Sequence, residues 1–309
     1  MKLLNKLLFL LTLMTTVSGI TQEQLPQFTQ YMYNTISINP AYAGSREALS
    51  IVGVYRDQWK GFDRSPKTST LSVHSPLRDD RIGVGLTFIN DALGHRNYNY
   101  IYGDFSYTIR TSENIKLAFG LKGGFTHSNF DSDLFNDSEF DYENDPTLVD
   151  NARSQWTPNM GVGLYLHTNR WYLGLSAPRI FNNDKSSDEG YVSFDHINYY
   201  FTGGYVFDLN EQIKLKPAFM LKGTKGAPLA VDATLNFLFY DKLWLGGAYR
   251  FGDGWGAIVD FQVLKQVRIG YAYESPVSDI RVATYGTHEI LAIFELTFNN
   301  SKMKSPRYF

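Results

Sequence analysis

Most of the chain after residue 48 consists of segments in which apolar and polar residues alternate. In NIKLAFGLKGGFTH (residues 114–127), one face carries large apolar side chains and the other carries lysine, alanine, glycine and threonine. The segments IKLKPAFMLKG (213–223) and QVRIGYAYE (266–274) repeat this alternation. A period of two residues is typical of β-strands with one apolar and one polar face. The pattern therefore predicts an all-β protein.

Turn residues separate about 14 such segments, an even number of the kind that bacterial single-chain barrels have. The segments begin near Ala48, Thr68, Arg81, Tyr98, Asn114, Gln155, Arg170, Asp195, Ile213, Pro228, Lys242, Trp255, Gln266 and His288. We expect a transmembrane outer-membrane β-barrel of antiparallel strands over residues 48–298. A soluble β-sandwich would show the same alternation. The extended aromatic face and the number of strands favour the barrel.

The connections between these segments alternate in length. Long ones are expected at residues 57–67, 91–97, 128–154, 178–194 and 275–287, although residues 224–227 and 252–254 are short links on the same side. Barrels of this class place short turns in the periplasm and long loops outside the cell. The alternation therefore predicts that both chain ends are periplasmic, including a short basic tail at residues 299–309.

Residues 1–20, MKLLNKLLFLLTLMTTVSGI, have two lysines before a leucine-rich core and small residues after it. This layout is typical of a secretory signal peptide, and the apolar core is too short to span a bilayer. An amphipathic helix is the alternative, but the apolar residues run consecutively instead of facing one side. The chain contains no cysteine, which excludes a lipid-anchored cysteine and disulfide bonds.

Composition narrows the class of protein further. Aromatic residues make up 16% of the 309 residues, the mean hydropathy is −0.26, and the formal net charge is −2. The near-balanced charge argues against nucleic acid as a partner. The absence of a second long apolar run argues against a helical membrane protein. Both observations agree with a barrel in outer-membrane lipid, in which only every second residue of a strand is apolar.

Catalytic chemistry has little support in the sequence. Gly174-Leu-Ser176-Ala-Pro178 resembles a nucleophile elbow, but its fifth position is proline and no α/β alternation surrounds it. The six histidines show no helical metal-binding spacing. The pairs Gly123-Gly124, Gly203-Gly204 and Gly246-Gly247 precede no helix and instead predict curvature or close approach in the barrel wall. We expect no enzyme and no cofactor, although a site assembled from distant strands stays open.

Residues 129–150, NFDSDLFNDSEFDYENDPTLVD, are acidic and contain no basic residue. Carboxylates here could bind Ca²⁺, with candidate ligands Asp131, Asp133, Asp141 and Asp145, but the spacing matches no EF-hand. A solvated surface loop is the alternative interpretation. Aromatic residues between the acids favour contact with a partner protein; the candidates are Phe130, Phe135, Phe140 and Tyr142.

Residues 27–44, QFTQYMYNTISINPAYAG, are aromatic, uncharged and rich in amides, without a strand or helix pattern. A barrel of about 14 strands encloses more space than its own side chains fill. Uncharged polar side chains can form hydrogen bonds in a polar lumen without burying a charge. We therefore expect residues 21–47 to be a non-strand segment at the periplasmic mouth or in the lumen. A disordered leader is the alternative, but so many aromatics are unusual in disorder.

Several motifs near this segment resemble the PorP/SprF family of outer-membrane proteins, which belong to the type IX secretion system of Bacteroidetes. They are QFTQYMYN (27–34), NPAYAGS (39–45) and RDQWKGF (56–62), followed by Pro66, Thr68 and Ser75-Pro76. Beyond residue 76 the resemblance is to barrel pattern and length only. It implies no catalytic residues.

The resemblance implies that the protein anchors or helps export a partner cell-surface protein. The implied partners are a secreted gliding adhesin with a C-terminal sorting domain and periplasmic, peptidoglycan-linked components of the secretion system. We expect Tyr31, Tyr33 and Trp59 to contribute to partner binding. A porin or transporter for small solutes is the alternative function, and an open or plugged lumen distinguishes the two.

Overall fold

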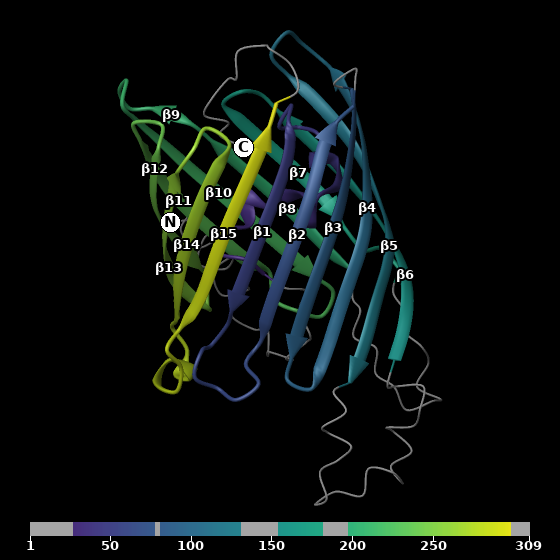
Figure 1. Cartoon of the computed structure of the whole chain (residues 1–309), viewed down its shortest axis with the longest axis vertical. Coiled ribbons are helices and arrows are strands. Elements are labelled where there is room, and N and C mark those ends of the chain that lie inside the picture. The colour runs from purple at the N-terminus through teal and green to yellow at the C-terminus, as the bar shows by residue number, and fades with distance from the viewer. Residues whose placement is uncertain (1–26, 78–80, 131–153, 182–196, 298–309) are drawn as a thin grey trace, which may run out of the picture.

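The computed structural model describes residues 27–77, 81–130, 154–181 and 197–297, which form a closed antiparallel β-barrel of 14 strands with one short extra strand outside it (Figure 1). The barrel strands are β1 (Leu49–Asp57), β2 (Lys67–Pro76), β3 (Ile82–Leu93), β4 (Arg96–Arg110), β5 (Lys116–Phe130), β6 (Ser154–His167), β7 (Trp171–Ala177), β8 (Asn198–Tyr205), β10 (Ile213–Thr224), β11 (Ala230–Phe239), β12 (Leu243–Arg250), β13 (Gly254–Gln262), β14 (Val267–Pro276) and β15 (Thr287–Leu296). The extra strand is β9 (Phe207–Asp208). The predicted fold class is confirmed.

Neighbouring strands pair in sequence order, and β1 pairs with both β2 and β15. Strand β10 pairs with β8 on one side and with β11 on the other, so the ring has no open edge. Closure supplies every wall strand with two hydrogen-bonding neighbours, as a bilayer requires. In the described residues no helix is long and apolar enough to cross a membrane.

The two faces of each strand have opposite exposure, as the alternation predicts. In β5, Leu121 is 54% exposed on the outside, whereas the next side chain, Lys122, is 3% exposed inside the barrel. Strand β15 repeats this with outward Ile290 and inward Glu289. The outward face of the strands is therefore mostly apolar and faces lipid, whereas their buried charged side chains face the lumen.

The barrel has a short-turn end, where β1 begins and β15 ends, and a long-connection end, where β1 ends and β15 begins. Residues 58–66 and 277–286 connect strands at the long-connection end. Residues 91–97, predicted as a long loop, differ: β3 and β4 extend until only Gly94 and His95 separate them. Gly94 adopts φ +61°, which glycine tolerates in a tight turn.

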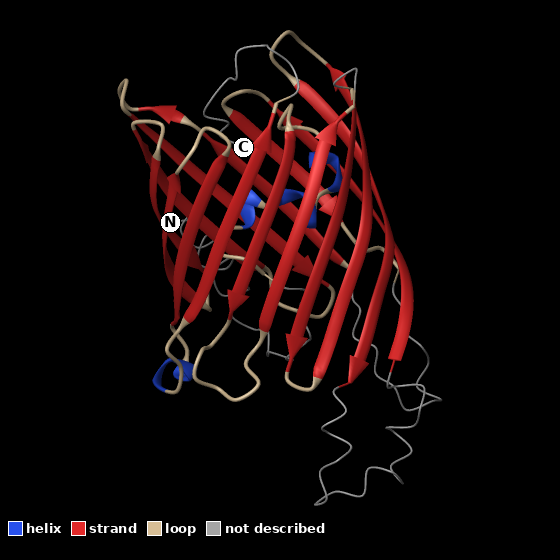
Figure 2. Ribbon diagram, in the orientation of Figure 1, coloured by secondary structure: helices blue, strands red, loops and turns tan. Residues whose placement is uncertain are grey.

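An irregular segment lies inside the barrel, where Figure 2 shows its helical turns surrounded by strands. It contains η1 (Tyr31–Tyr33), α2 (Thr35–Ile38) and η2 (Pro40–Tyr42), while a further turn, η8 (Asp279–Val282), belongs to a long connection. We call residues 28–43 the plug. Every one of its residues is buried or half-buried. Of the predicted non-strand segment, residues 28–43 therefore lie in the lumen, and residues 21–26 fall outside the described part of the chain.

The plug runs along the lumen from one end of the barrel toward the other. Phe28 lies beside Arg250 and Gly254, which are at the long-connection end. Gly44 packs against Pro76 and Gly83, which are at the short-turn end. Both chain termini fall outside the described residues, so their periplasmic location stays a prediction.

Candidate functional site

The first residues of the plug are held by a carboxylate from the lumen wall. The backbone N–H groups of Thr29 and Gln30 donate to the two carboxylate oxygens of Glu289, at 2.9 and 2.8 Å. Arg56 lies beside Glu289, with Nη1 3.2 Å from Oε2. Glu289 and Arg56 are each 1% exposed. Because one carboxylate satisfies two successive backbone donors, the direction of the chain is fixed at this point.

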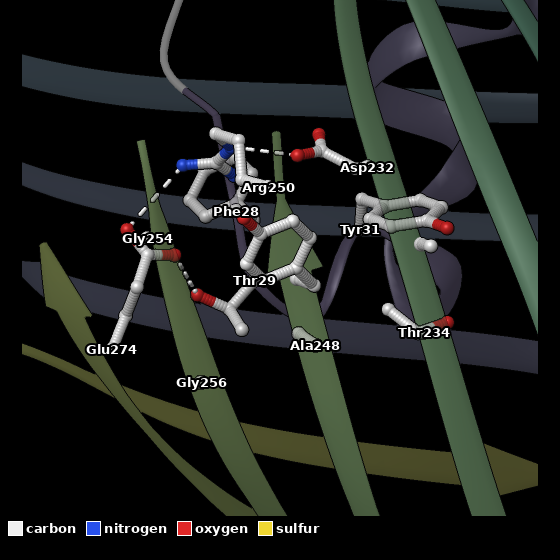
Figure 3. A pocket seen from close by; sticks show the side chains of 12 residues that line it. Phe28, Thr29, Tyr31, Asp232, Thr234, Ala248, Arg250, Gly254, Gly256 and Glu274 are labelled. Atoms are coloured by element: carbon white, nitrogen blue, oxygen red, sulfur yellow. Dashed lines mark hydrogen bonds and ion pairs between the residues drawn. The ribbon is translucent and has the colours of Figure 1, made fainter. Parts of the chain in front are cut away.

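A second group of charges lies around Thr29 (Figure 3). The Thr29 hydroxyl donates to Glu274 at 2.8 Å, and Arg56 Nη2 lies 3.1 Å from the other oxygen of Glu274. Arg250 joins Glu274 to Asp232, with contacts of 3.4 and 2.7 Å. These ion pairs come from β1, β11, β12, β14 and β15. We call Arg56, Asp232, Arg250, Glu274 and Glu289 the charged clamp.

The middle of the plug contacts cations without forming an ion pair. The ring of Tyr33 lies 5.4 Å from Lys216 Nζ and 5.1 Å from the guanidinium carbon of Arg268. Trp244 lies below the same two cations, at 6.0 and 5.8 Å. The Tyr33 side chain is 1% exposed. The aromatic faces stabilise the two buried cations.

The helical turn α2 is bound through its carbonyl groups. Lys122 Nζ donates to the Ile36 carbonyl at 3.3 Å and also pairs with Asp104 at 2.7 Å. The Ser176 hydroxyl donates to the Ile38 carbonyl at 2.7 Å. Carbonyl groups at the end of so short a helix have no partner within it, so the wall satisfies them instead.

The Asn39-Pro40 turn fits against glycines of the wall. The Asn39 side chain accepts from the Ala41 N–H at 3.0 Å and donates to the Leu164 carbonyl at 2.9 Å. A Cβ added at Gly120 would lie 2.0 Å from the Ala41 nitrogen, and one at Gly163 would lie 2.1 Å from Asn39 Oδ1. These two wall positions must therefore be glycine for the plug to sit as it does.

The plug leaves the lumen at the short-turn end. Gly44 has φ +73°, and its N–H donates to His74 Nδ1 at 3.2 Å. The buried side chain of Arg46 pairs with Glu295 and donates to the Tyr42 hydroxyl at 3.3 Å. These contacts turn the chain from the lumen into β1.

The long-connection end presents a second candidate surface. The connections 58–66 and 277–286 are joined by backbone hydrogen bonds, Lys60 N–H to the Gly286 carbonyl at 2.8 Å and Tyr285 N–H to the Lys60 carbonyl at 2.7 Å. Trp59 is half-buried, and its N–H donates to the Thr287 hydroxyl. Four apolar side chains stand exposed on these two connections: Phe62, Val277, Val282 and Tyr285. We call them the apolar rim.

The predicted partner-binding residues fall into three groups. Tyr31 and Tyr33 are 4% and 1% exposed and contact the lumen wall, and Trp59 lies next to the apolar rim. Phe130 ends β5, but its side chain is outside the described residues. Phe135, Phe140 and Tyr142 are outside them too, as are the proposed Ca²⁺ ligands Asp131, Asp133, Asp141 and Asp145. Partner binding by all of these residues stays a prediction.

The sequence did not single out the charged clamp. Its residues lie far apart in the chain. All that they share in the sequence is an inward-facing position near the end of a strand. Among the described residues, no group of three or more histidine, aspartate and glutamate side chains is arranged to hold a metal ion. The charges of the clamp pair with one another and with the plug, an arrangement that stabilises structure.

The closed barrel with an apolar outer face defines an outer-membrane protein. The model of the family described as "Type IX secretion system membrane protein PorP/SprF" matches residues 20–294. The chain therefore belongs to this family, and it is a membrane protein of the type IX secretion system.

Similar solved structures are other barrels. The outer membrane protein Omp33 of Acinetobacter baumannii is 9% identical with a TM-score of 0.47, and the match covers 81% of this chain and 98% of that one. The NanC porin is 10% identical with a TM-score of 0.43, and the match covers 81% and 100%. A search of curated proteins found no match.

Proposed function

We propose that this barrel anchors, or helps export, a partner cell-surface protein of the type IX secretion system, and that it is neither an enzyme nor a solute channel. Family membership supports the link to secreted cargo. The observation that carries the proposal is the plug, which lies in the lumen and is bound to the wall along its length. A lumen filled in this way leaves recognition to the outer surfaces.

The partner is a secreted adhesin with a C-terminal sorting domain, and periplasmic, peptidoglycan-linked components meet the short-turn end. Barrels of this class direct their long connections outward. The apolar rim is then at the cell surface, and its exposed side chains suit the core of a protein interface. Tyr285 is 76% exposed, yet the backbone beneath it is fixed by the bonds to Lys60. A rigid apolar surface binds with a smaller loss of entropy.

A strain lacking the protein tests the function directly. We expect it to lose display of one adhesin and to lose gliding, while other type IX cargo still reaches the surface and small-solute uptake is unchanged. Recognition by one complementary surface makes the loss selective. Normal adhesin display together with reduced uptake of a nutrient would refute the proposal and support a porin.

Point variants test whether the apolar rim is the surface that binds the adhesin. Val282→Asp combined with Tyr285→Asp should abolish adhesin display without affecting barrel assembly. Lys225→Asp, in the exposed turn between β10 and β11 at the same end, is the matched control and should display the adhesin normally. Equal display by both variants would exclude the apolar rim.

A separate experiment tests whether the plug closes the lumen to ions. Deletion of residues 27–44 should leave a barrel that still shifts on gels when heated but conducts more ions in planar bilayers. Unchanged conductance would show that the plug does not close the lumen.

A further inference from the structure

The outer face of the barrel is hollowed over strands β7, β8 and β10 to β13. The hollow has a volume of about 1220 Å³, and none of the residues that line it is charged. Its floor contains small residues, among them Gly204, Ala233 and Gly247. Large aromatic and aliphatic side chains surround them, from Trp171 near the short-turn end to Trp255 near the long-connection end.

The sequence explains why the wall is hollow here. The ladder between β8 and β10 ends at Gly204 and Ala218, and pairing along β10 resumes where Leu215 of β10 faces Phe207 of β9. Pro217 lies in this gap and has no N–H to donate, so the wall lacks a ladder bond at this point. The pairs Gly203-Gly204 and Gly246-Gly247 belong to the same part of the wall, where they supply no bulky side chain. Small floor residues beside large neighbours leave a depression.

The hollow faces the bilayer, because the residues that line it include the outward apolar side chains of membrane-spanning strands. Tryptophan side chains at two heights are typical of the aromatic girdles at the two membrane interfaces. The hollow therefore extends across the hydrocarbon layer. An empty apolar space of this size would lose dispersion contacts along its whole lining, so it must be filled.

We propose that the hollow is a binding site for the acyl chains of a membrane lipid, held there longer than lipid elsewhere around the barrel. Acyl chains match the apolar lining, reach the hollow directly from the bilayer, and can adapt to an uneven floor. A polar or charged occupant would find no charged side chain among the lining residues. The proposal depends on the barrel being in a membrane and not on its anchoring function.

The test compares a variant whose new side chain fills the hollow with a variant that carries the same substitution elsewhere on the outer face. A Cβ added at Gly247 has only the Gly256 carbonyl oxygen within 4 Å, at 3.7 Å, and one added at Gly123 on the outer face of β5 has nothing within 4 Å. Gly247→Phe should therefore fill the hollow, and Gly123→Phe is the matched control. The native barrel and both variants should shift on gels when heated.

The protein and the two variants are reconstituted into vesicles that contain phospholipid with a photoactivatable acyl chain. In the native protein and in Gly123→Phe, the yield of crosslinks should be several-fold higher at Phe219 and Leu235, in the hollow, than at Leu121 on the outer face of β5. Gly247→Phe should abolish this difference. Equal yields at all three residues of the native protein, or enrichment that persists in Gly247→Phe, would overturn the proposal.

Native mass spectrometry of protein extracted from cells identifies the occupant. Lipid adducts that are present in the native protein and in Gly123→Phe but lost from Gly247→Phe support the proposal. If Gly247→Phe instead loses a copurifying protein and keeps the lipid, the hollow binds a protein and the proposal is wrong.

Discussion

The lumen face and the membrane face of the barrel wall place different demands on their side chains, as two adjacent residues of β5 illustrate. Lys122 points into the lumen, where it pairs with Asp104 and donates to the plug carbonyl of Ile36. Gly123, the next residue, faces outward into open space. On the lumen face such charged positions have to match a particular partner, whereas on the membrane face a residue needs only to be apolar and of acceptable size.

This difference indicates at which positions a substitution should destabilise the protein. A buried charge lowers the stability of the fold unless its partner is present, because nothing then offsets the free-energy cost of removing the charge from water. The charged clamp and the uncharged plug therefore depend on each other. The outer wall can be altered at many positions without such consequences.

The largest effect should come from removing the central cation of the clamp. Arg56→Ala leaves Glu289 without its cation and Glu274 with only Arg250. The free energy of unfolding should fall by about 3–5 kcal/mol, measured by denaturant unfolding in detergent. Tyr55→Ala, which changes the outward neighbour, should have a much smaller effect. Equal effects would contradict the contrast between the two faces.

Gly120→Leu should displace the plug while leaving the wall intact. The new side chain would overlap the backbone of Ala41, and overpacking of this kind costs about 1–3 kcal/mol. Conductance in planar bilayers should rise and the plug should become sensitive to protease. Gly123→Leu, three residues along the same strand and facing outward, should behave like the native protein. A closed lumen in Gly120→Leu would show that the plug is not held by this fit.

Thr29→Val tests one uncharged side chain of the plug that bonds to two charged residues. It removes the hydroxyl that donates to Glu274 and accepts from Arg56, while keeping the shape of the side chain. The expected loss of unfolding free energy is about 1–2 kcal/mol. Thr111→Val, whose hydroxyl bonds an exposed turn, serves as the control and should lose less. A larger loss in the control would mean that the turn, and not the lumen, limits stability.

The smallest effect is expected outside the lumen. Arg170 pairs with Asp208, but their side chains are 58% and 39% exposed. Arg170→Ala should change the free energy of unfolding by about 0–1 kcal/mol, and added salt should remove even this difference. A change as large as that of Arg56→Ala would show that burial does not separate the two ion pairs.

Local patterning was sufficient to predict the barrel. Strand β10 begins at Ile213 as predicted, and β15 begins one residue before the predicted His288. The prediction succeeds because a two-residue period reports the face of each side chain directly. It was wrong for residues 91–97, because two strands can extend through polar residues as far as one glycine that permits a tight turn.

The sequence by itself thus determined the strands, the face on which each residue lies and an uncharged segment suited to a polar lumen. Only the tertiary structure decided which charges meet and which wall glycines contact the plug. Thr29 and Glu289 are 260 residues apart, and their contact exists only because closure of the ring brings β15 next to β1. Periodicity is a local property, whereas a pairing across the lumen depends on the register of every strand in between.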